Sequence, residues 1–463
     1  MSLKSHTLKA QIELMNYALP RDLGDGLVMR VATCNDAEPL AQFNGRVFGR
    51  ERFDELTAAY SRHITSESHQ VIGPSNVLVV EDTRAQGKIV STMCLIPQTW
   101  TYAGIPFPVG RPEVVATDPD YRNRGLVREQ FKSIHALSDA MGHLVQGITG
   151  IPYYYRQFEY EYALDLSGGR MCYFSNVPTL KVEDPVNPSG KNETEPFRLR
   201  AMTCDDIPFI APLYDRECAR SLVACPRPEW LWRYWLDESP LARAYRLPFQ
   251  IIETMEGRAV GYVDCNHDIW QDAIVVSEIA VADGQSLRAV MPTVLRWMKA
   301  HGEAESARQN KPIRSIYFAL GHEHPVYDAI PELLPKPRLL YSWYIRVPDV
   351  PRFIRHIAPA LEARLARSTM AGYSGELKIS EYRRGFKIVF ENGKIRNAEM
   401  WQPTVDERGD CGFPPLVFLQ LLFGRKSLLE LREFLPDAWA NDQAAVLLDA
   451  LFPKMYSCVS AVA

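Results

Sequence analysis

The sequence predicts a mixed α/β and α+β protein, with two tandem α/β domains followed by a smaller α+β domain. Three observations lead to this prediction. A chain of 463 residues is too long to form one hydrophobic core. A pattern of strands and helices recurs once, and after about residue 348 it is replaced by consecutive strands followed by helices. We therefore expect domains at residues 1–170, 171–348 and 349–463.

The repeat consists of short segments that recur in the same order. MRVATCND, from Met29, reappears as LRAMTCDD, from Leu199, and each is a strand pattern that leads into residues able to cap a helix. VLVVED, from Val77, corresponds to QIIET, from Gln250, and GKIVS, from Gly87, corresponds to GRAVG, from Gly257. Each copy therefore predicts a two-stranded hairpin. EVVATD and EIAVAD follow in their respective copies. This order indicates a duplicated α/β domain.

The last part of the chain has a different pattern. FIRHIAPALEARLA predicts a helix, and three strand patterns follow it, each beginning with glycine: GELKISEY, GFKIVFEN and GKIRNAEM. Helical patterns then appear around PPLVFLQLLFG and NDQAAVLLDALF. Strands that precede helices in this way are typical of an α+β domain.

Composition and charge exclude several classes of protein. The formal net charge of −4 gives no overall attraction to nucleic acid. No apolar run approaches the roughly 18 residues of a membrane span, and the first 20 residues lack the apolar core of a signal peptide. Nine cysteines without a CxxC pair predict thiols in a reducing cytoplasm. His322-Glu-His324 lacks a partner cluster, so we expect no metal site.

One stretch combines the features of a phosphate site: DPDYRNRGLVREQ, residues 118–130. A strand and a turn lead into an amphipathic helix that carries Arg124, Arg128 and Lys132 at spacings of four. Cations are unfavourable at the positive end of a helix unless an anion lies between them. Gly125 would let a ligand approach the unpaired N–H groups of the first turn. The stretch therefore predicts a phosphate-binding helix N-terminus, with a solvated basic helix face as the alternative.

The same stretch resembles a family motif. Arg122-x-x-Gly125-x-Val127 resembles the pyrophosphate-binding motif [QR]-x-x-G-x-[GA] of the GNAT superfamily of N-acetyltransferases, with Val127 in place of the small last residue. GITGIPYYYRQFEYEYAL, from Gly147, also resembles that fold, with Glu159 where the family commonly has glycine. Two GNAT-like domains followed by a sterol-carrier-protein-like domain resemble the enhanced-intracellular-survival type of acetyltransferase. LLELREFLPDAW and LLDALFPK are part of this resemblance, which covers nearly the whole chain.

The resemblance implies a function and a set of binding residues. It implies transfer of an acetyl group from acetyl-CoA directly to a primary amine of a small molecule or a lysine side chain, by a homo-oligomer that binds neither metal nor nucleic acid. It places pantetheine on the strand, pyrophosphate on the turn and the thioester beside the loop after the next strand. The expected coenzyme-binding residues are Val115, Ala116, Thr117, Asn123, Arg124, Gly125, Leu126, Val127, Arg128, Gly150 and Ile151.

The second copy serves as an internal comparison for the phosphate site. Where the first copy has DPDYRNRGLVREQ, the second has ADGQSLRAVMPTV, with one arginine and a proline early in the helix. We therefore expect only the first copy to bind the coenzyme, and the second to shape the substrate cleft.

The resemblance also implies catalytic residues. Tyr155 matches the family's general acid, which protonates the departing thiolate, while packing is the alternative role for a run of tyrosines. For the base there are two candidates. The resemblance implies the terminal carboxylate, here Ala463, and a period-two reading places Glu113 on the strand face of Val115 and Thr117. Because Glu278 recurs at the position of Glu113 in the second copy, we rank Ala463 above Glu113.

Two other functions stay open at this point. The chain could bind a lipid or another hydrophobic ligand through apolar surfaces of the third domain, such as Phe413, Phe418 and Phe423, around a cavity. It could also be a regulatory protein that binds CoA without transferring an acyl group.

Overall fold

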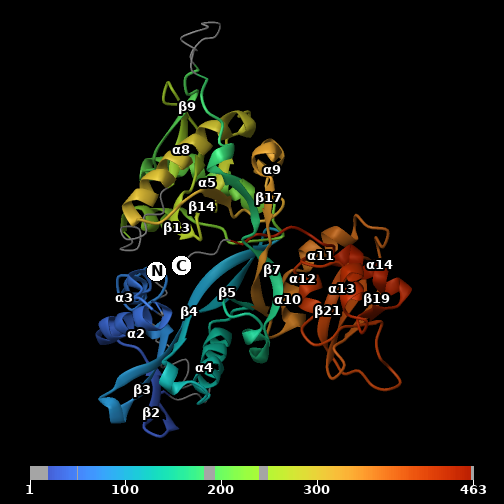
Figure 1. The fold of residues 1–463 in the computed structure, drawn as a ribbon. Coiled ribbons are helices and arrows are strands. Elements are labelled where there is room, and N and C mark those ends of the chain that lie inside the picture. Colours follow the sequence, from blue (N-terminus) through green and yellow to red (C-terminus); the bar gives the residue numbers. More distant parts are fainter. Residues whose placement is uncertain (1–18, 50, 182–192, 239–248, 460–463) are drawn as a thin grey trace. The chain divides into compact units, whose positions relative to one another are not determined.

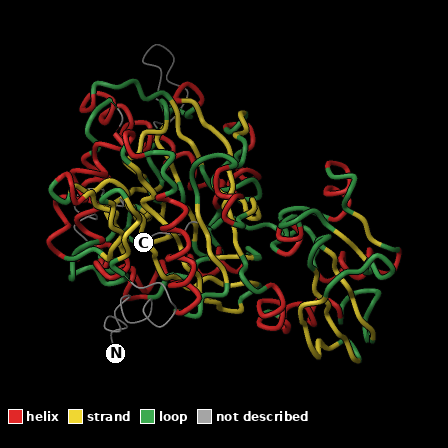
Figure 2. The backbone as a smooth tube through the Cα atoms, turned by 90° about the horizontal axis from the view of Figure 1, so that it is seen from below, coloured by secondary structure: helices red, strands yellow, loops and turns green. Residues whose placement is uncertain are grey.

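The computed structural model describes residues 19–49, 51–181, 193–238 and 249–459, and it has the predicted mixture of helices and strands throughout (Figures 1 and 2). The chain divides into two compact units, and both are discontinuous in sequence. The first comprises residues up to Leu164, Ser221–Cys225 and Ser342–Ala463, and the second comprises Asp165–Arg220 and Pro226–Tyr341. The predicted domain limits therefore stay predictions, because the compact units do not follow contiguous ranges.

The first unit is built on a nine-stranded sheet in the order β1-β2-β3-β4-β5-β6-β18-β7, with β10 paired to β4. Helices α2 and α3 share a core cluster with one face of this sheet, and α4 shares another with the opposite face (Figure 1). The elements are β1 (Arg21–Gly24), β2 (Leu27–Val31), α2 (Ala37–Gly49), α3 (Glu55–Ile64), β3 (Val77–Asp82), β4 (Lys88–Tyr102), β5 (Ile105–Thr117), α4 (Leu126–Ala140), β6 (Val145–Ile148), β7 (Glu161–Leu166), β10 (Val223–Ala224) and β18 (Tyr341–Arg346).

The second unit has two sheets, in the orders β15-β12-β11-β9 and β13-β14-β16-β8-β17. Its elements are β8 (Gly169–Tyr173), β9 (Phe197–Ala201), α5 (Ile207–Ala219), α6 (Glu229–Arg233), β11 (Gln250–Thr254), β12 (Ala259–Val263), β13 (Asn266–Trp270), β14 (Ala273–Val276), β15 (Ile279–Val281), α8 (Leu287–Gln309), β16 (Ser315–Phe318), α9 (Val326–Ala329) and β17 (Lys336–Arg338).

The predicted repeat is confirmed in local structure. In both copies the strand is followed by a threonine whose N–H is accepted by an aspartate three residues later. Arg30 binds that aspartate, Asp36, at 2.8 Å, and Arg200 binds its counterpart, Asp206, at 2.6 Å. The predicted hairpins are the antiparallel pairs β3–β4 and β11–β12. Matching ion pairs at matching positions indicate a common origin for the two copies.

The second copy breaks the long strands that are continuous in the first. Its β12 and β13 correspond to β4, and its β14 and β15 correspond to β5. Asp264 lies at the break and accepts the N–H groups of Ser277 (2.7 Å) and Glu278 (2.8 Å). A buried carboxylate thus takes the place of a ladder partner, and the strands separate there.

Two strands lie in sheets that their sequence positions did not indicate. β8 belongs to a sheet of the second unit, although it begins before the predicted limit at 170. β18 lies within the range 171–348 but joins the first sheet between β6 and β7, where Tyr344 pairs with Ile148. The periodicity of a strand predicts its faces but not its partner, which depends on tertiary contacts.

The segment after Pro348 has the predicted α+β pattern, with a sheet in the order β21-β20-β19-β22-β23. The three predicted strand patterns are confirmed as β19, β20 and β21. The single helix predicted for FIRHIAPALEARLA is wrong, because Pro359 lacks an N–H and the segment forms two helices that meet at Ile357. The elements are α10 (Val350–His356), α11 (Ala358–Leu365), β19 (Gly375–Ser380), β20 (Gly385–Glu391), β21 (Lys394–Trp401), β22 (Cys411–Gly412), α12 (Phe418–Leu422), α13 (Leu428–Phe434), β23 (Trp439–Ala440) and α14 (Asp442–Leu451).

The three phenylalanines considered for ligand binding are buried in this segment. The rings of Phe413 and Phe418 lie 5.8 Å apart, and Phe423 stacks on Phe353 at 5.5 Å. These side chains make ring contacts within the core of the segment. The likeness of this segment to sterol carrier proteins stays a prediction.

Candidate active site

An extra residue in β5 changes which side chains share a face. Between the pairs Thr92–Ala116 and Cys94–Glu113, one residue of β4 lies opposite two of β5, including Val114 (φ +52°), which is a β-bulge. Glu113 lies opposite Cys94, which belongs to the core under α2, whereas Val115 packs in the core under α4. The prediction that Glu113 shares a face with Val115 and Thr117 is therefore wrong. A period-two reading of a strand cannot detect a bulge.

The predicted pantetheine residues lie on a free stretch of β5. β5 and β6 are parallel and pair at Val109 and Gly110, and the pairing extends no further along these two described strands. Val115, Ala116 and Thr117 come after this point, so one edge of their backbone has no strand partner in β6. Peptide-like amide groups of a ligand can pair with such an edge.

The turn between β5 and α4 presents backbone donors. Asn123 (φ +62°) and Gly125 (φ +76°) are left-handed, and α4 begins without a side-chain cap on its described N-terminus. Glu129 donates its N–H to the Gly125 carbonyl at 3.1 Å. The N–H groups of residues 126–128 precede this bond and have no intrahelical acceptor. A Cβ built on Gly125 would meet nothing within 4 Å, so the space in front of these donors is open.

Three exposed arginines surround this turn: Arg122, Arg124 and Arg128. Arg124 lies over the Tyr121 ring at 4.8 Å, and Arg128 donates to the Gln157 side chain at 3.1 Å. Among the described side chains, no carboxylate lies within ion-pair distance of any of the three. The predicted stripe is therefore charged and uncompensated at the helix N-terminus, although Lys132 is paired with Glu129 (2.6 Å).

The corresponding turn of the second copy is satisfied internally. Ser286 caps α8 and accepts the N–H of Ala289 at 3.2 Å. Arg288, in the first turn, forms an ion pair with Glu332 at 2.7 Å. One N–H of the first turn and the arginine beside it are thus occupied in the second copy.

Tyr155 lies beside the loop predicted to receive the thioester. It belongs to the short helix η5 (Tyr154–Phe158), is 4% exposed and packs edge-on against Phe131 of α4 at 5.9 Å. A Cβ built on Gly150 would lie 3.4 Å from the Tyr155 hydroxyl oxygen. Ile151 follows and is 55% exposed. The structure thus brings Tyr155, Gly150 and Ile151 together, next to the helix that carries the arginines.

Tyr344 is a site residue that the sequence did not reveal. It comes from β18, and its ring packs edge-on against Tyr155 at 5.3 Å and stacks on Tyr162 at 4.0 Å. Its hydroxyl donates to the Ile151 carbonyl at 3.0 Å. Tyr344 is 193 residues from Ile151, and no local pattern in YSWYIR points to this contact.

Glu159 occupies a position suited to glycine. Its φ is +68°, a left-handed conformation that glycine adopts at least cost. The carboxylate binds Arg346 of β18 at 3.1 Å. This contact compensates for the departure from the family's usual residue.

Glu113, the second candidate base, is held by an arginine. Arg111 donates to it at 2.5 Å, and the guanidinium lies over the Trp343 ring at 5.0 Å. In the second copy Glu278 is bound by Arg227, also at 2.5 Å. A glutamate neutralised in both copies fits a structural role better than that of a base. Ala463, the preferred base, lies outside the described residues.

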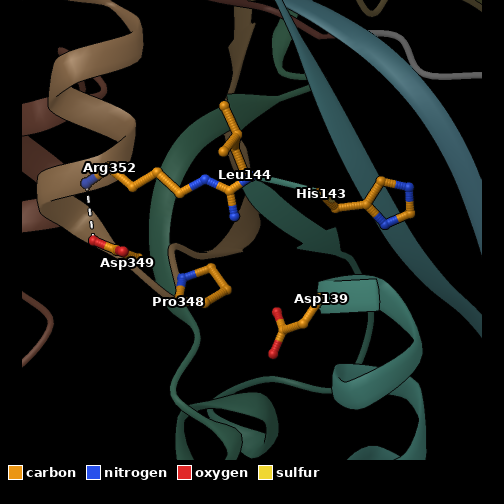
Figure 3. Close-up of a pocket in the computed structure, with 6 residues that line it drawn as sticks. All are labelled: Asp139, His143, Leu144, Pro348, Asp349 and Arg352. Atoms are coloured by element: carbon orange, nitrogen blue, oxygen red, sulfur yellow. Dashed lines mark hydrogen bonds between the residues drawn. The ribbon is translucent and has the colours of Figure 1, made fainter. Parts of the chain in front are cut away.

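A cavity of 170 Å³ lies at the other end of α4, lined by Asp139, His143, Leu144, Pro348, Asp349 and Arg352. Figure 3 shows Asp139 and Arg352 reaching it from α4 and α10, where Asp349 accepts the Arg352 N–H at 2.8 Å. Burial raises the pKa of Asp139 and lowers that of His143 to about 4. At 1.5 Å per helical residue, Asp139 is about 20 Å along α4 from Leu126. None of the predicted site residues lines this cavity.

Neither a metal-binding cluster nor a membrane-spanning helix is present among the described residues. No group of three or more His, Cys, Asp or Glu side chains there could hold a metal ion. Nor does that part of the chain contain a helix with the length and hydrophobicity needed to cross a membrane.

Comparison with known families identifies the first copy. Residues 28–163 match the family model of an acetyltransferase (GNAT) domain. The chain carries a GNAT acetyltransferase domain. It is therefore an acyltransferase, and the matched range includes the turn, the arginines, Tyr155 and Gly150. No curated protein has a sequence that matches this chain.

Solved structures share the fold of this chain over almost its entire length. A probable N-acyltransferase from Enterococcus faecalis V583 is 13% identical, with a TM-score of 0.58 and coverage of 93% of this chain and 97% of that one. A GCN5-related N-acetyltransferase from Anabaena variabilis ATCC 29413 is 14% identical, with a TM-score of 0.60 and coverage of 94% and 99%. Eis1 from Mycobacterium abscessus is 14% identical, with a TM-score of 0.57 and coverage of 93% and 99%.

These similarities confirm the predicted fold class. At such identities the likeness concerns the fold alone.

Proposed function

We propose that this enzyme transfers an acetyl group from acetyl-CoA directly to a primary amine of a small molecule or a lysine side chain. One observation carries the proposal: the N-terminus of α4 is open and uncapped, and the arginines around it have no carboxylate partner among the described residues. A diphosphate would accept the unpaired N–H groups and neutralise the cations. The residues present therefore fit the phosphate portion of a coenzyme A thioester.

The neighbouring residues fit the rest of such a ligand. The free edge of β5 at Val115, Ala116 and Thr117 would pair with the amide groups of pantetheine. Gly150 and Ile151 would lie along its thioester end, and Val127 packs its side chain on the core under α4 and leaves the turn open. Bound acetyl-CoA would supply an activated acyl group.

The proton transfers would be made by the chain's own groups. We assign the Tyr155 hydroxyl, which faces Gly150, as the donor of a proton to the departing sulfur. We assign the terminal carboxylate of Ala463 as the acceptor of the amine's proton, with Glu113 as the second candidate. The proposal includes a cytoplasmic location and a homo-oligomer, as the resemblance implies.

Titration calorimetry with acetyl-CoA tests the phosphate site. Arg124→Ala and Arg128→Ala should each weaken binding by about tenfold, because a charge-assisted hydrogen bond contributes about 1.5–3 kcal/mol when buried and less at a surface. Arg288→Ala is the matched control, since this arginine of the second copy is bound to Glu332. Unchanged affinity in both first-copy variants would contradict the proposal.

Thiol release separates this function from a regulatory one. With a panel of amines that includes aminoglycosides and lysine peptides, an acetyltransferase releases CoA at a rate that depends on the amine. A protein that only binds the coenzyme releases none. Lipid binding by the segment after Pro348, around Phe413, Phe418 and Phe423, stays the alternative, and binding of acetyl-CoA in the calorimetric titration distinguishes the two functions.

A further inference from the structure

We infer that Trp343, together with β10, positions the C-terminal tail for catalysis. The inference rests on the proposed function, in which the terminal carboxylate accepts the amine's proton. It adds the residues that would hold the tail, and these are positioning residues because they act through it.

The described part of the tail is hydrogen-bonded to two separate segments of the first unit. Met455 donates its N–H to the Gly424 carbonyl at 2.9 Å. From β10, Leu222 donates its N–H to the Tyr456 carbonyl (2.8 Å) and Val223 donates its own to the Ser457 hydroxyl (3.0 Å). These bonds order the backbone between the helix α14 and the last described residue.

β10 is itself fixed to the sheet of the GNAT domain. Val223 lies opposite Tyr102 in β4, and Ala224 lies opposite Thr101. The chain thus enters the first unit for five residues, Ser221–Cys225, between stretches of the second unit. Within the first unit, this short passage joins the tail to β4, the strand that pairs with β5.

Trp343 holds the last described residue. Its side chain is 2% exposed, and its indole N–H donates to the Val459 carbonyl at 3.0 Å. The ring packs edge-on against Trp100 at 5.4 Å and lies under the Arg111 guanidinium at 5.0 Å. Arg111 belongs to β5, which also carries the predicted pantetheine residues. The tail is therefore bound next to the strand on which the coenzyme is proposed to lie.

β18 connects the tail to the general acid. Trp343 and Tyr344 are neighbours in this strand, so their side chains point to opposite faces of the sheet. Trp343 binds the tail, while Tyr344 packs against Tyr155 and binds the Ile151 carbonyl. One strand thus contacts both the proposed general acid and the last described residue of the tail, and a defined geometry for the reaction requires such fixed contacts.

A double-mutant cycle tests this role in the full chain. Trp343→Phe keeps an aromatic ring but removes the indole N–H, and Ser457→Ala removes the other side-chain anchor with little change in volume. A third variant ends at Val459 and lacks the terminal carboxylate. We expect kcat to fall about tenfold in each point variant and at least as much in the shortened chain, with the Kd for acetyl-CoA unchanged. Trp343→Phe in the shortened chain should cause no further loss.

Trp100→Phe is the matched control. It removes an indole N–H from the same cluster, but this group donates to Gln98 and not to the tail. Trp100→Phe should therefore leave kcat of the full chain unaffected, and shortening the chain to Val459 should lower kcat as much in this variant as in the unaltered protein.

The possible results are distinguishable. If the shortened chain keeps the full kcat, or if it loses activity while Trp343→Phe and Ser457→Ala do not, the positioning role is overturned. The same holds if the Trp343→Phe and shortening effects simply multiply, because that is the result of general destabilisation. Absence of thiol release by the unaltered chain would instead overturn the proposed function and this inference together.

Discussion

At the residue scale, the position of Tyr155 leads to a direct test. Tyr155→Phe removes the hydroxyl beside Gly150 and keeps the ring packed on Phe131. General acid catalysis typically contributes about 10²–10⁴ in rate, so kcat should fall by about 100-fold or more with the Kd for acetyl-CoA unchanged. Tyr154→Phe, in the adjacent residue, should have little effect. Equal rates for Tyr155→Phe and the unaltered enzyme would exclude the acid role.

Three histidines of the GNAT domain make its stability depend on pH. Burial lowers the pKa of His63 to about 4, of His135 to about 3 and of His143 to about 4. The unfolded chain takes up these protons near pH 6.5, whereas the folded chain takes them up only near pH 3 to 4. Stability is therefore fully present above pH 6.5 and falls as the pH drops through this window, by at most about 1.4 kcal/mol per pH unit and per histidine.

Urea unfolding between pH 7 and pH 4.5 measures this dependence. His143→Gln should make the fall in unfolding free energy less steep. A pH-independent unfolding free energy over this range would show that the buried histidines do not control acid stability.

At the scale of elements, the turn before α4 can be tested against its counterpart. Gly125 and Gly284 have nearly the same left-handed φ, +76° and +77°, and a Cβ on either would meet nothing within 4 Å. Gly125→Ala and Gly284→Ala should each lower the unfolding free energy by about 1–2 kcal/mol, the cost of this conformation for an L-residue. Only Gly125→Ala should also weaken acetyl-CoA binding, since its methyl group would stand before the unpaired N–H groups. Equal acetyl-CoA affinities for the two variants would contradict a ligand at this turn.

The strand, turn and helix of this region could be predicted because their signals are local. Gly125 and the periodic apolar residues Phe131, Ile134 and Leu137 fix where α4 lies and which face it buries. The bulge at Val114 could not be predicted, because EVVAT reads as an uninterrupted strand. As a result the binding residues near the turn were proposed from the sequence, whereas the face of Glu113 was not predicted correctly.

At the scale of the whole molecule, the sequence predicted the duplication but not the exchange of strands. Repeated ion pairs such as Arg30–Asp36 and Arg200–Asp206 could be predicted because the same residue types recur in the two copies of the sequence. The placement of β18 between β6 and β7 depends on contacts such as Tyr344 with Tyr155, which join residues far apart in sequence. Tyr344 and Trp343 were missed for this reason.

The placement of β18 predicts how the chain behaves when it is cut. The range 1–170 alone lacks β18, and with it the strand between β6 and β7, so we expect this fragment to show no cooperative thermal unfolding by circular dichroism. Cleavage at a protease site inserted in residues 182–192 would divide the chain into two fragments without interrupting any strand of the first sheet. After cleavage, the fragments should stay associated on size exclusion and keep their acetyl-CoA affinity, because β18 of one pairs with β6 of the other. A stable, coenzyme-binding fragment 1–170 would show that the exchange is dispensable and would favour contiguous domains at the predicted limits.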